Sequence, residues 1–235
     1  MRRSSASKVR LPRSARRRLL TAGLESLESR QLLTVAPMLL DINTAPGSSS
    51  PRNFVEVGGT TFFTAEDNES GIELWKTDGT EAGTTLVKDI REGSLSSLPA
   101  FLTNVGGTLF FVANDGVNGV ELWKSDGTSA GTVLVSDIRP GSSSSGPNNL
   151  TNVNGTLFFR AANSSNGAEL WKSDGTTAGT VLVRDIRTGT PSSGPDQLTN
   201  INGTVFFTAN NGINGTELWK SDGSSGGTVL VKDIR

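Results

Sequence analysis

The sequence predicts an all-β fold in which four four-stranded antiparallel blades form a β-propeller-like array. The first observation is a strict 48-residue period, because the segment Glu121–Thr128 recurs four times along the chain. A period of about 20–50 residues is typical of repeat architectures. The second observation is that each period holds four short segments of strand character, as one propeller blade does. The four units span residues 44–91, 92–139, 140–187 and 188–235.

The second unit shows how the strands are identified. Its β-branched, aromatic and aliphatic side chains favour strands at residues 102–105, 108–113, 120–125 and 132–138. The pair Gly106-Gly107 separates the first two strands, and the equivalent Asn154-Gly155 of the third unit favours a two-residue hairpin. The segment Asp126–Thr128 turns the chain into the last strand. Each unit is therefore expected to be a meander of four strands.

Both faces of these strands are apolar. In the strand at residues 108–113, Leu109, Phe111 and Ala113 alternate with Phe110 and Val112, so each face carries aromatic and aliphatic groups. Repeats of this kind bury their apolar faces only against their neighbours. The units are therefore expected to fold only as an array. A radial propeller and an open stack of sheets both meet this requirement.

Residues 35–43 are expected to be the isolated last strand of a preceding partial unit, because Asp41 precedes Asp89 by 48 residues. The chain would then hold 17 strands instead of 16. Two arrangements follow: a ring in which one terminal strand is surplus, or a partial array from a longer repeat protein. An exposed terminal strand would favour edge-strand association with further repeats.

Residues 1–34 are expected to form a basic leader that is partly helical or disordered. Residues 1–30 hold nine Lys/Arg and two Glu, a balance of +7, whereas residues 31–235 hold 13 and 21, a balance of −8. Leucines at helical spacing predict a short helix over residues 15–33. The leader is interpreted as a targeting segment, a basic tail without a role, or an arm for nucleic acid or a membrane surface. The stretch Leu27–Leu33 resembles the LEPR-XLL motif of large exported bacterial proteins, with Ser29 in place of its proline, and this resemblance implies export.

Composition excludes several classes of site. The chain has no Cys, His or Tyr, so it has no disulfide, no thiolate or imidazole ligand and no usual general base. Any metal site must use oxygen ligands, which favours calcium or magnesium. No apolar run approaches the roughly 20 residues that a membrane span needs. The acidic repeats are expected to repel nucleic acid.

The recurring segment resembles a known signature. Glu73–Thr80, Glu121–Thr128 and Glu169–Thr176 are similar to the ELWxxDGT repeat family, and Glu217–Ser224 departs from the signature only at Ser224. The resemblance covers residues 35–235. It implies a propeller-like repeat module of exported bacterial proteins, located outside the cell or in the cell envelope. The family has no assigned chemistry, so the resemblance indicates location more than mechanism.

Two recurring sets of side chains are candidate ligand sites. The aspartate of each Asp-Gly turn either caps its own turn or contributes to a calcium-binding loop. These aspartates are Asp78, Asp126, Asp174 and Asp222. The tryptophans are core residues or, if exposed, a set for stacking on carbohydrate. They are Trp75, Trp123, Trp171 and Trp219.

Two further carboxylates recur in every unit. The aspartates of the last strands are expected to tie neighbouring turns or to pair with the arginine two residues on, and a ring that binds a cation is the alternative. They are Asp89, Asp137, Asp185 and Asp233. The glutamates that precede Leu-Trp are expected to bond to the backbone or across strands, because four equivalent copies argue against the asymmetric carboxylate pair of a glycosidase. They are Glu73, Glu121, Glu169 and Glu217.

Together these patterns favour a non-enzymatic, exported repeat scaffold that presents loops for contact with protein or polysaccharide. A carbohydrate- or calcium-binding propeller module is the alternative. An enzyme fragment whose catalytic residues lie elsewhere or are carboxylates only is the third hypothesis, and the equal lengths of the four units argue against it. No cofactor is expected, apart from calcium in the second hypothesis.

Overall fold

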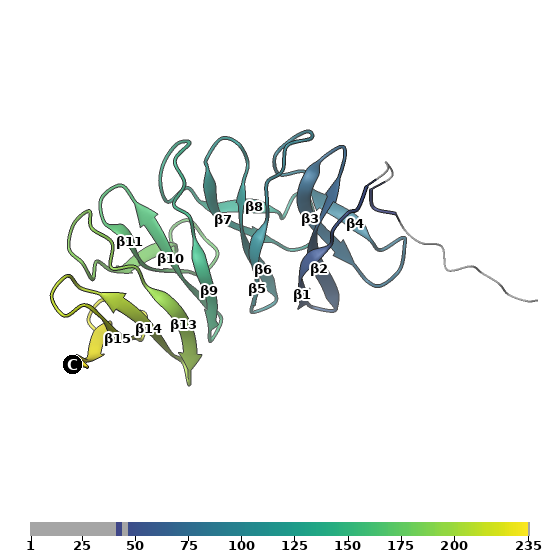
Figure 1. The fold of residues 1–235 in the computed structure, drawn as a ribbon. Coiled ribbons are helices and arrows are strands. Elements are labelled where there is room, and N and C mark those ends of the chain that lie inside the picture. The colour runs from purple at the N-terminus through teal and green to yellow at the C-terminus, as the bar shows by residue number, and fades with distance from the viewer. Residues whose placement is uncertain (1–40, 44–46, 235) are drawn as a thin grey trace, which may run out of the picture. The chain divides into compact units, whose positions relative to one another are not determined.

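A computed structural model describes residues 41–43 and 47–234, which form four four-stranded antiparallel sheets (Figure 1). In each sheet the strands lie side by side in chain order. The all-β, propeller-like array of four blades is therefore confirmed. The leader at residues 1–34, with its expected helix at residues 15–33, lies outside the described residues. Within the described ranges, no helix has the length and hydropathy needed to cross a membrane.

Each sheet is called a blade, numbered in chain order. Blade 1 consists of β1 (Arg52–Val57), β2 (Thr60–Asp67), β3 (Gly71–Thr77) and β4 (Thr85–Lys88). Blade 2 consists of β5 (Ala100–Val105), β6 (Thr108–Asn114), β7 (Val120–Ser125) and β8 (Val133–Ser136). Blade 3 consists of β9 (Asn148–Val153), β10 (Thr156–Asn163), β11 (Gly167–Ser173) and β12 (Val181–Arg184). Blade 4 consists of β13 (Asp196–Ile201), β14 (Thr204–Asn210), β15 (Thr216–Ser221) and β16 (Val229–Lys232).

The first hairpin of each blade has the expected two-residue turn. Asn154 and Gly155 both have positive φ, at 52° and 85°, and Gly106 and Gly107 have φ of 60° and 88°. Two successive positive φ angles define the turn type whose twist matches that of paired strands. The Asn-Gly and Gly-Gly pairs occur here because they adopt this conformation at low cost.

The last strand of each unit is shorter than expected. The expected strand at residues 132–138 is observed as β8, Val133–Ser136. Ile138 leaves the sheet because its backbone N–H donates to the side chain of Glu121 at 3.2 Å, in place of a strand partner. Apolar side chains extend beyond the strand, so sequence alternation overestimated its length.

The hydrophobic core lies between neighbouring blades. Phe62 and Leu74 of blade 1 pack in one cluster with Phe111 and Trp123 of blade 2, and equivalent clusters join blades 2 and 3 and blades 3 and 4. We call the side of a blade that meets the next blade its trailing face, and the opposite side its leading face. In blades 2 and 3, the two adjacent residues of the Phe-Phe pair therefore belong to two different junctions. The expectation that neighbouring blades bury each other's apolar faces is thus confirmed at the three junctions.

The segment before blade 1 covers part of that blade's leading face. Ile42 packs against Phe63, Ala65 and Trp75. Its counterpart 48 residues later, Ile90, occupies the same place in the cluster between blades 1 and 2. The described part of the expected strand at residues 35–43, namely residues 41–43, is not in a strand. The remainder of that segment lies outside the described residues.

Candidate functional site

The Asp-Gly-Thr turns are built from side chains that cap their own backbone. Asp126 Oδ1 accepts hydrogen bonds from Thr128 N and Thr128 Oγ1, at 2.8 and 2.7 Å. Thr128 Oγ1 in turn accepts from Gly131 N at 2.9 Å. The bonds from the Thr128 hydroxyl and amide hold the pKa of Asp126 below its ordinary value. A Cβ on Gly131 would lie 2.1 Å from Asp126 Oδ1, which explains the glycine five residues after each turn aspartate.

The same turn recurs in all four blades, so the turn aspartates are structural caps. Within the described ranges, no group of three or more His, Cys, Asp or Glu side chains could hold a metal ion. Each turn therefore offers calcium one carboxylate, and any further ligands would have to be backbone oxygens or water. The capping aspartates are Asp78, Asp126, Asp174 and Asp222.

A buried glutamate fastens each of the first three blades to the segment that follows it. Glu121 has no exposed surface, and its Oε1 accepts from Ser145 N at 2.7 Å. Its Oε2 accepts from Ser145 Oγ and from Ile138 N. Burial raises the pKa of Glu121 to about 7, although the bonds from Ser145 and Ile138 act in the opposite direction. The expected backbone pairing of these glutamates is confirmed, and their complete burial keeps them from any substrate.

This arrangement, called the Glu–Ser clamp, is repeated across three connections. Its glutamate and serine are 24 residues apart, and the serine lies near the end of the connection, just before the first strand of the next blade. The glutamates are also buried in the other two clamps, where burial is the main cause of their raised pKa. The pairs are Glu73 with Ser97, Glu121 with Ser145 and Glu169 with Ser193.

The tryptophans are core residues and do not form a surface for stacking on carbohydrate. Their exposed fractions are 9%, 6%, 8% and 5% for Trp75, Trp123, Trp171 and Trp219. The core interpretation is confirmed, and the exposure that carbohydrate stacking requires is absent. In the described part of the chain, the buried indole Nε1 of each tryptophan has no hydrogen-bond partner.

The last-strand aspartates tie the turn that follows them. Asp89 Oδ2 accepts from Gly93 N at 3.0 Å, and Asp137 Oδ2 accepts from Gly141 N at 3.2 Å. Asp185 Oδ2 accepts from Gly189 N, and it also accepts from the side chain of a residue in the preceding loop. The interpretation that these aspartates tie turns is confirmed for the first three blades. Within the described residues, the other carboxylate oxygen of each, Oδ1, is buried and has no hydrogen-bond partner.

A lysine in each of the first three blades crosses to the next blade, which the sequence did not indicate. Lys76 Nζ donates to the carbonyl oxygen of Gly127 at 2.8 Å. Phe62 lies beside this lysine, and its Cζ would be 3.2 Å from a Cβ on Gly127. Glycine at this position of the turn thus allows the ring of Phe62 in the preceding blade to approach closely. Lys76 and Gly127 are 51 residues apart in the sequence. Only the recurrence of both residues every 48 positions could have suggested the contact.

A cavity lies where blades 1 and 2 meet, beside the loop between β6 and β7. Its volume is 580 Å³, and its lining combines charged and apolar side chains. The charged ones include Lys88, Asp89, Arg91 and Asp115, and the apolar ones include Leu95 and the buried Trp123. Val117 stands at its rim with 68% of its surface exposed. Burial opposes ionisation of Asp115, but bonds from the loop outweigh it and lower the pKa of Asp115. The cavity is therefore charged, open to solvent and edged by an apolar side chain.

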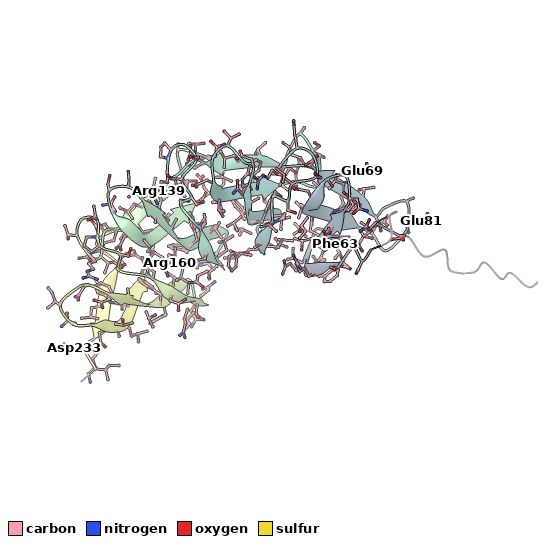
Figure 2. All side chains as sticks on the ribbon, turned by 45° about the horizontal axis from the view of Figure 1, so that its top comes forward. Phe63, Glu69, Glu81, Arg139, Arg160 and Asp233 are labelled. Carbon is pink, nitrogen blue, oxygen red and sulfur yellow. The ribbon has the colours of Figure 1, made fainter. Side chains whose placement is uncertain are left out.

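The loops on this edge differ between blades, whereas the Asp-Gly pair of the turns is the same in all four. The variable loops join the second and third strands of each blade, and Figure 2 shows Glu69 on the first of them and Glu81 on the separate β3–β4 turn. Two of these loops expose an apolar side chain, Val117 at 68% and Ile213 at 87%. The variable loops are residues 68–70, 115–119, 164–166 and 211–215.

Comparison with known proteins supports the fold. No family model matches the chain, and no curated protein matches it. The crystal structure of a puromycin hydrolase S511A mutant complexed with PGG is similar, with a TM-score of 0.52 and 14% identity over 77% of this chain and 30% of that one. An α-L-arabinofuranosidase from Clostridium thermocellum ATCC 27405 gives a TM-score of 0.33 and 14% identity over 78% of this chain and 71% of that one.

These similarities concern the fold alone. The chain spans about 30% of the length of the puromycin hydrolase, and an identity of 14% carries no activity across. The TM-score of the arabinofuranosidase is too low to argue from. What the hydrolase comparison supports is the arrangement of consecutive four-stranded antiparallel blades.

Proposed function

We propose that the chain is a non-catalytic, exported repeat scaffold of the ELWxxDGT type, whose variable loops contact polysaccharide or protein. One observation carries the proposal: the clamp glutamates, the turn aspartates and the junction lysines serve the array itself, while the loops between the second and third strands differ between blades and are exposed. The clamp glutamates are buried, the turn aspartates cap their turns, and the junction lysines of the first three blades bond to the next blade. In these positions, none of the three sets is placed to act as a general acid or base on a ligand.

The cavity between blades 1 and 2 is the part of this surface that best suits a polar ligand. Arg91 and Lys88 supply donors, and Asp89 and Asp115 supply acceptors. Hydroxyl-rich ligands pair with both kinds of group at once. The exposed Val117 adds an apolar contact at the rim. We therefore place a polysaccharide site here, with protein contact as the second form of the same scaffold.

The binding test uses a panel of soluble neutral and acidic polysaccharides, measured by isothermal titration calorimetry. Arg91→Ala is expected to weaken binding about tenfold, as for the loss of a charged hydrogen bond of about 1.5 kcal/mol. Arg52→Ala is the matched control, since Arg52 is an exposed arginine at the start of β1 that does not line the cavity. Equal weakening by both variants would contradict this site. Release of shortened saccharides would contradict a non-catalytic role.

The calcium-binding alternative rests on the four turn aspartates. Thermal unfolding with calcium and with a chelator separates the two forms of the proposal, because a bound ion stabilises the folded state. An unchanged midpoint removes calcium from the proposal. A calcium-dependent midpoint whose shift becomes smaller in Asp126→Asn would establish it.

Export is the remaining part of the proposal, and it rests on the basic leader with its motif at Leu27–Leu33. Residues 1–34 fused to a reporter that is active only outside the cytoplasm should direct that reporter out of a bacterial cell. A fusion that stays in the cytoplasm would contradict export by this segment.

A further inference from the structure

The trailing face of blade 4 is uncovered, although it carries the same residue types as the covered faces. Leu218 is 37% exposed, Val231 44% and Ile234 66%. Their counterparts in blade 3 are at most 8% exposed, because blade 4 lies on them. Ile201 and Phe206 complete this surface, Ile201 with 49% of its surface exposed. A contiguous apolar surface of this kind marks an interaction site.

The polar groups on the same side of blade 4 lack the partners that their counterparts have. In blades 1 to 3 the clamp glutamate receives two bonds from a serine of the following connection. Glu217 receives its bond from Ile234 N at 3.1 Å, and within residues 41–43 and 47–234 no serine bonds to it. Nor does any carbonyl in these ranges accept from Lys220, although Lys172 donates to Gly223 O. This side of blade 4 is therefore half of a junction.

The leading side of blade 1 carries the other half. The carbonyl oxygen of Ser49 accepts a hydrogen bond from Glu66 N, and the carbonyl oxygens of the clamp serines accept the equivalent bond in the other blades. The clamp serines also donate their hydroxyl groups to a glutamate, but in the described residues no glutamate accepts from the Ser49 hydroxyl. A Cβ placed on Gly79 would have no atom within 4 Å. A Cβ placed on the equivalent glycine of each later blade would contact a phenylalanine ring of the preceding blade; these glycines are Gly127, Gly175 and Gly223. Phe54 is 63% exposed, while its counterparts in blades 2 to 4 pack in junction clusters.

We propose that the trailing face of blade 4 binds the leading side of blade 1 in a second copy of this chain, so that the protein associates head to tail. The three internal junctions define the contacts between the two copies. Ser49 of one copy would donate to Glu217 of the other, and Lys220 would donate to the carbonyl oxygen of Gly79. Leu218 would be buried against the incoming blade, close to its Phe54. Such an interface joins two different surfaces, so it generates a ring or an open filament.

Two details limit the strength of this contact. Ile42 already packs on the leading face of blade 1 at the place that the incoming Ile234 would take, so the neighbour must displace it. In blade 2, the side-chain amide of Asn104 donates to the backbone of the preceding blade. The equivalent residue of blade 1 is Glu56, whose carboxylate cannot donate, so the contact between copies lacks this bond. The association is therefore expected to be reversible and to depend on concentration.

The test is the mass of the 235-residue chain in solution, measured by light scattering and sedimentation over a range of concentrations. The wild type is expected to rise from its monomer mass of 24.6 kDa to multiples of it. We call the trailing face of blade 4 the tail and the leading side of blade 1 the head. Leu218→Glu on the tail and Phe54→Glu on the head should each abolish this rise in mass. Ile213→Glu is the matched control, since Ile213 is 87% exposed on a loop outside the junction, and it should associate like the wild type.

Mixing the two variants decides the geometry. The tail variant keeps an intact head and the head variant keeps an intact tail, so the mixture should form a dimer with one copy of each and nothing larger. A wild type that stays monomeric overturns the proposal. A head variant that still dimerises overturns it as well, because that result means tail-to-tail pairing. Should Leu218→Glu fail to fold, as judged by circular dichroism, Lys220→Glu replaces it on the exposed tail.

Discussion

Blades 3 and 4 contain the same five residues in their third strands, Glu169–Ser173 and Glu217–Ser221, yet these strands lie in different environments. Leu170 is fully buried, whereas Leu218 is 37% exposed. Both leucines follow the same alternation in the same sheet order. The blade determines which way the side chain points, and the next blade determines whether it is buried.

The turns behave in the opposite way. Asp174 Oδ1 accepts from Thr176 N at 2.8 Å, and Asp222 Oδ1 accepts from Ser224 N at the same distance. These bonds lie within one blade, so the missing neighbour does not affect them. The comparison thus separates features that one blade contains from features that two blades share.

The largest expected difference concerns the leucines. Leu170→Ala should lower the free energy of unfolding by about 2–5 kcal/mol, because it leaves a cavity in a packed junction. Leu218→Ala should lower it by only about 0.5 kcal/mol, as for a surface change. Urea unfolding of the two variants, at a concentration where the protein is monomeric, measures both values. Equal losses would show that blade 4 is covered in solution.

The clamp glutamate predicts an unusual pH dependence. The pKa of Glu121 is about 7 in the folded chain against an ordinary 4.5, so between these values the folded state binds more protons than the unfolded state. The stabilisation from this proton is complete below about pH 4.5 and is lost as the pH rises through about 7. It amounts to about 3 kcal/mol at about 1.4 kcal/mol per pH unit.

Glu121→Gln should therefore make the fall in stability between about pH 4.5 and 7 shallower, with the contributions of Glu73 and Glu169 remaining, as measured by urea unfolding at several pH values. Asp126→Asn is the control. The pKa of Asp126 lies below its ordinary value because of the Thr128 bonds, so its titration falls at lower pH. A stability that rises across this window in the wild type would contradict the raised pKa of the clamp glutamates.

The turn glycines test the features that one blade contains. A Cβ on Gly179 or Gly227 would lie 2.1 Å from the turn carboxylate in either blade. Alanine at each position should therefore lower the free energy of unfolding by about 1–3 kcal/mol, the usual effect of overpacking. Gly226→Ala is the control, since nothing lies within 4 Å of a Cβ there. Unequal effects in blades 3 and 4, measured by urea unfolding, would mean that the turn depends on its neighbour.

The smallest expected difference concerns the junction lysines. Lys172→Met should lower the free energy of unfolding by about 1 kcal/mol, because its bond to Gly223 O at 2.8 Å is lost. Lys220→Met should leave the stability unchanged, since no carbonyl in the described ranges accepts from Lys220. Thermal unfolding of both variants provides the measurement. An equal loss would point to a partner for Lys220 in solution.

Much of the fold was predictable from the sequence because it depends on local chemistry. The strand at Val120–Ser125 was predicted with its observed bounds, and the Asn154-Gly155 turn follows from the conformations open to those two residues. The Phe-Phe pair predicted two buried faces, since adjacent side chains in a strand point to opposite sides. The strand ending at Ser136 was predicted too long because apolar residues continue beyond it.

The candidate site was less predictable, because its contacts join distant residues. The clamp of Glu121 with Ser145 spans 24 residues, and the bond of Lys76 to Gly127 spans 51. Alternation along a strand contains no information about either contact. The sequence left the tryptophans open between core and carbohydrate stacking, and their burial decided the question.

By itself, the sequence determined the blade: its period, its four strands, its turns and the two directions in which its apolar side chains point. Each of these depends on steric preferences and hydrogen bonds within about 48 residues. Only the tertiary structure decided which faces are buried, which carboxylates are capped or clamped, and that the trailing face of blade 4 is uncovered. The physical reason is that burial belongs to a pair of surfaces, so identical residues differ wherever the neighbouring blade is missing.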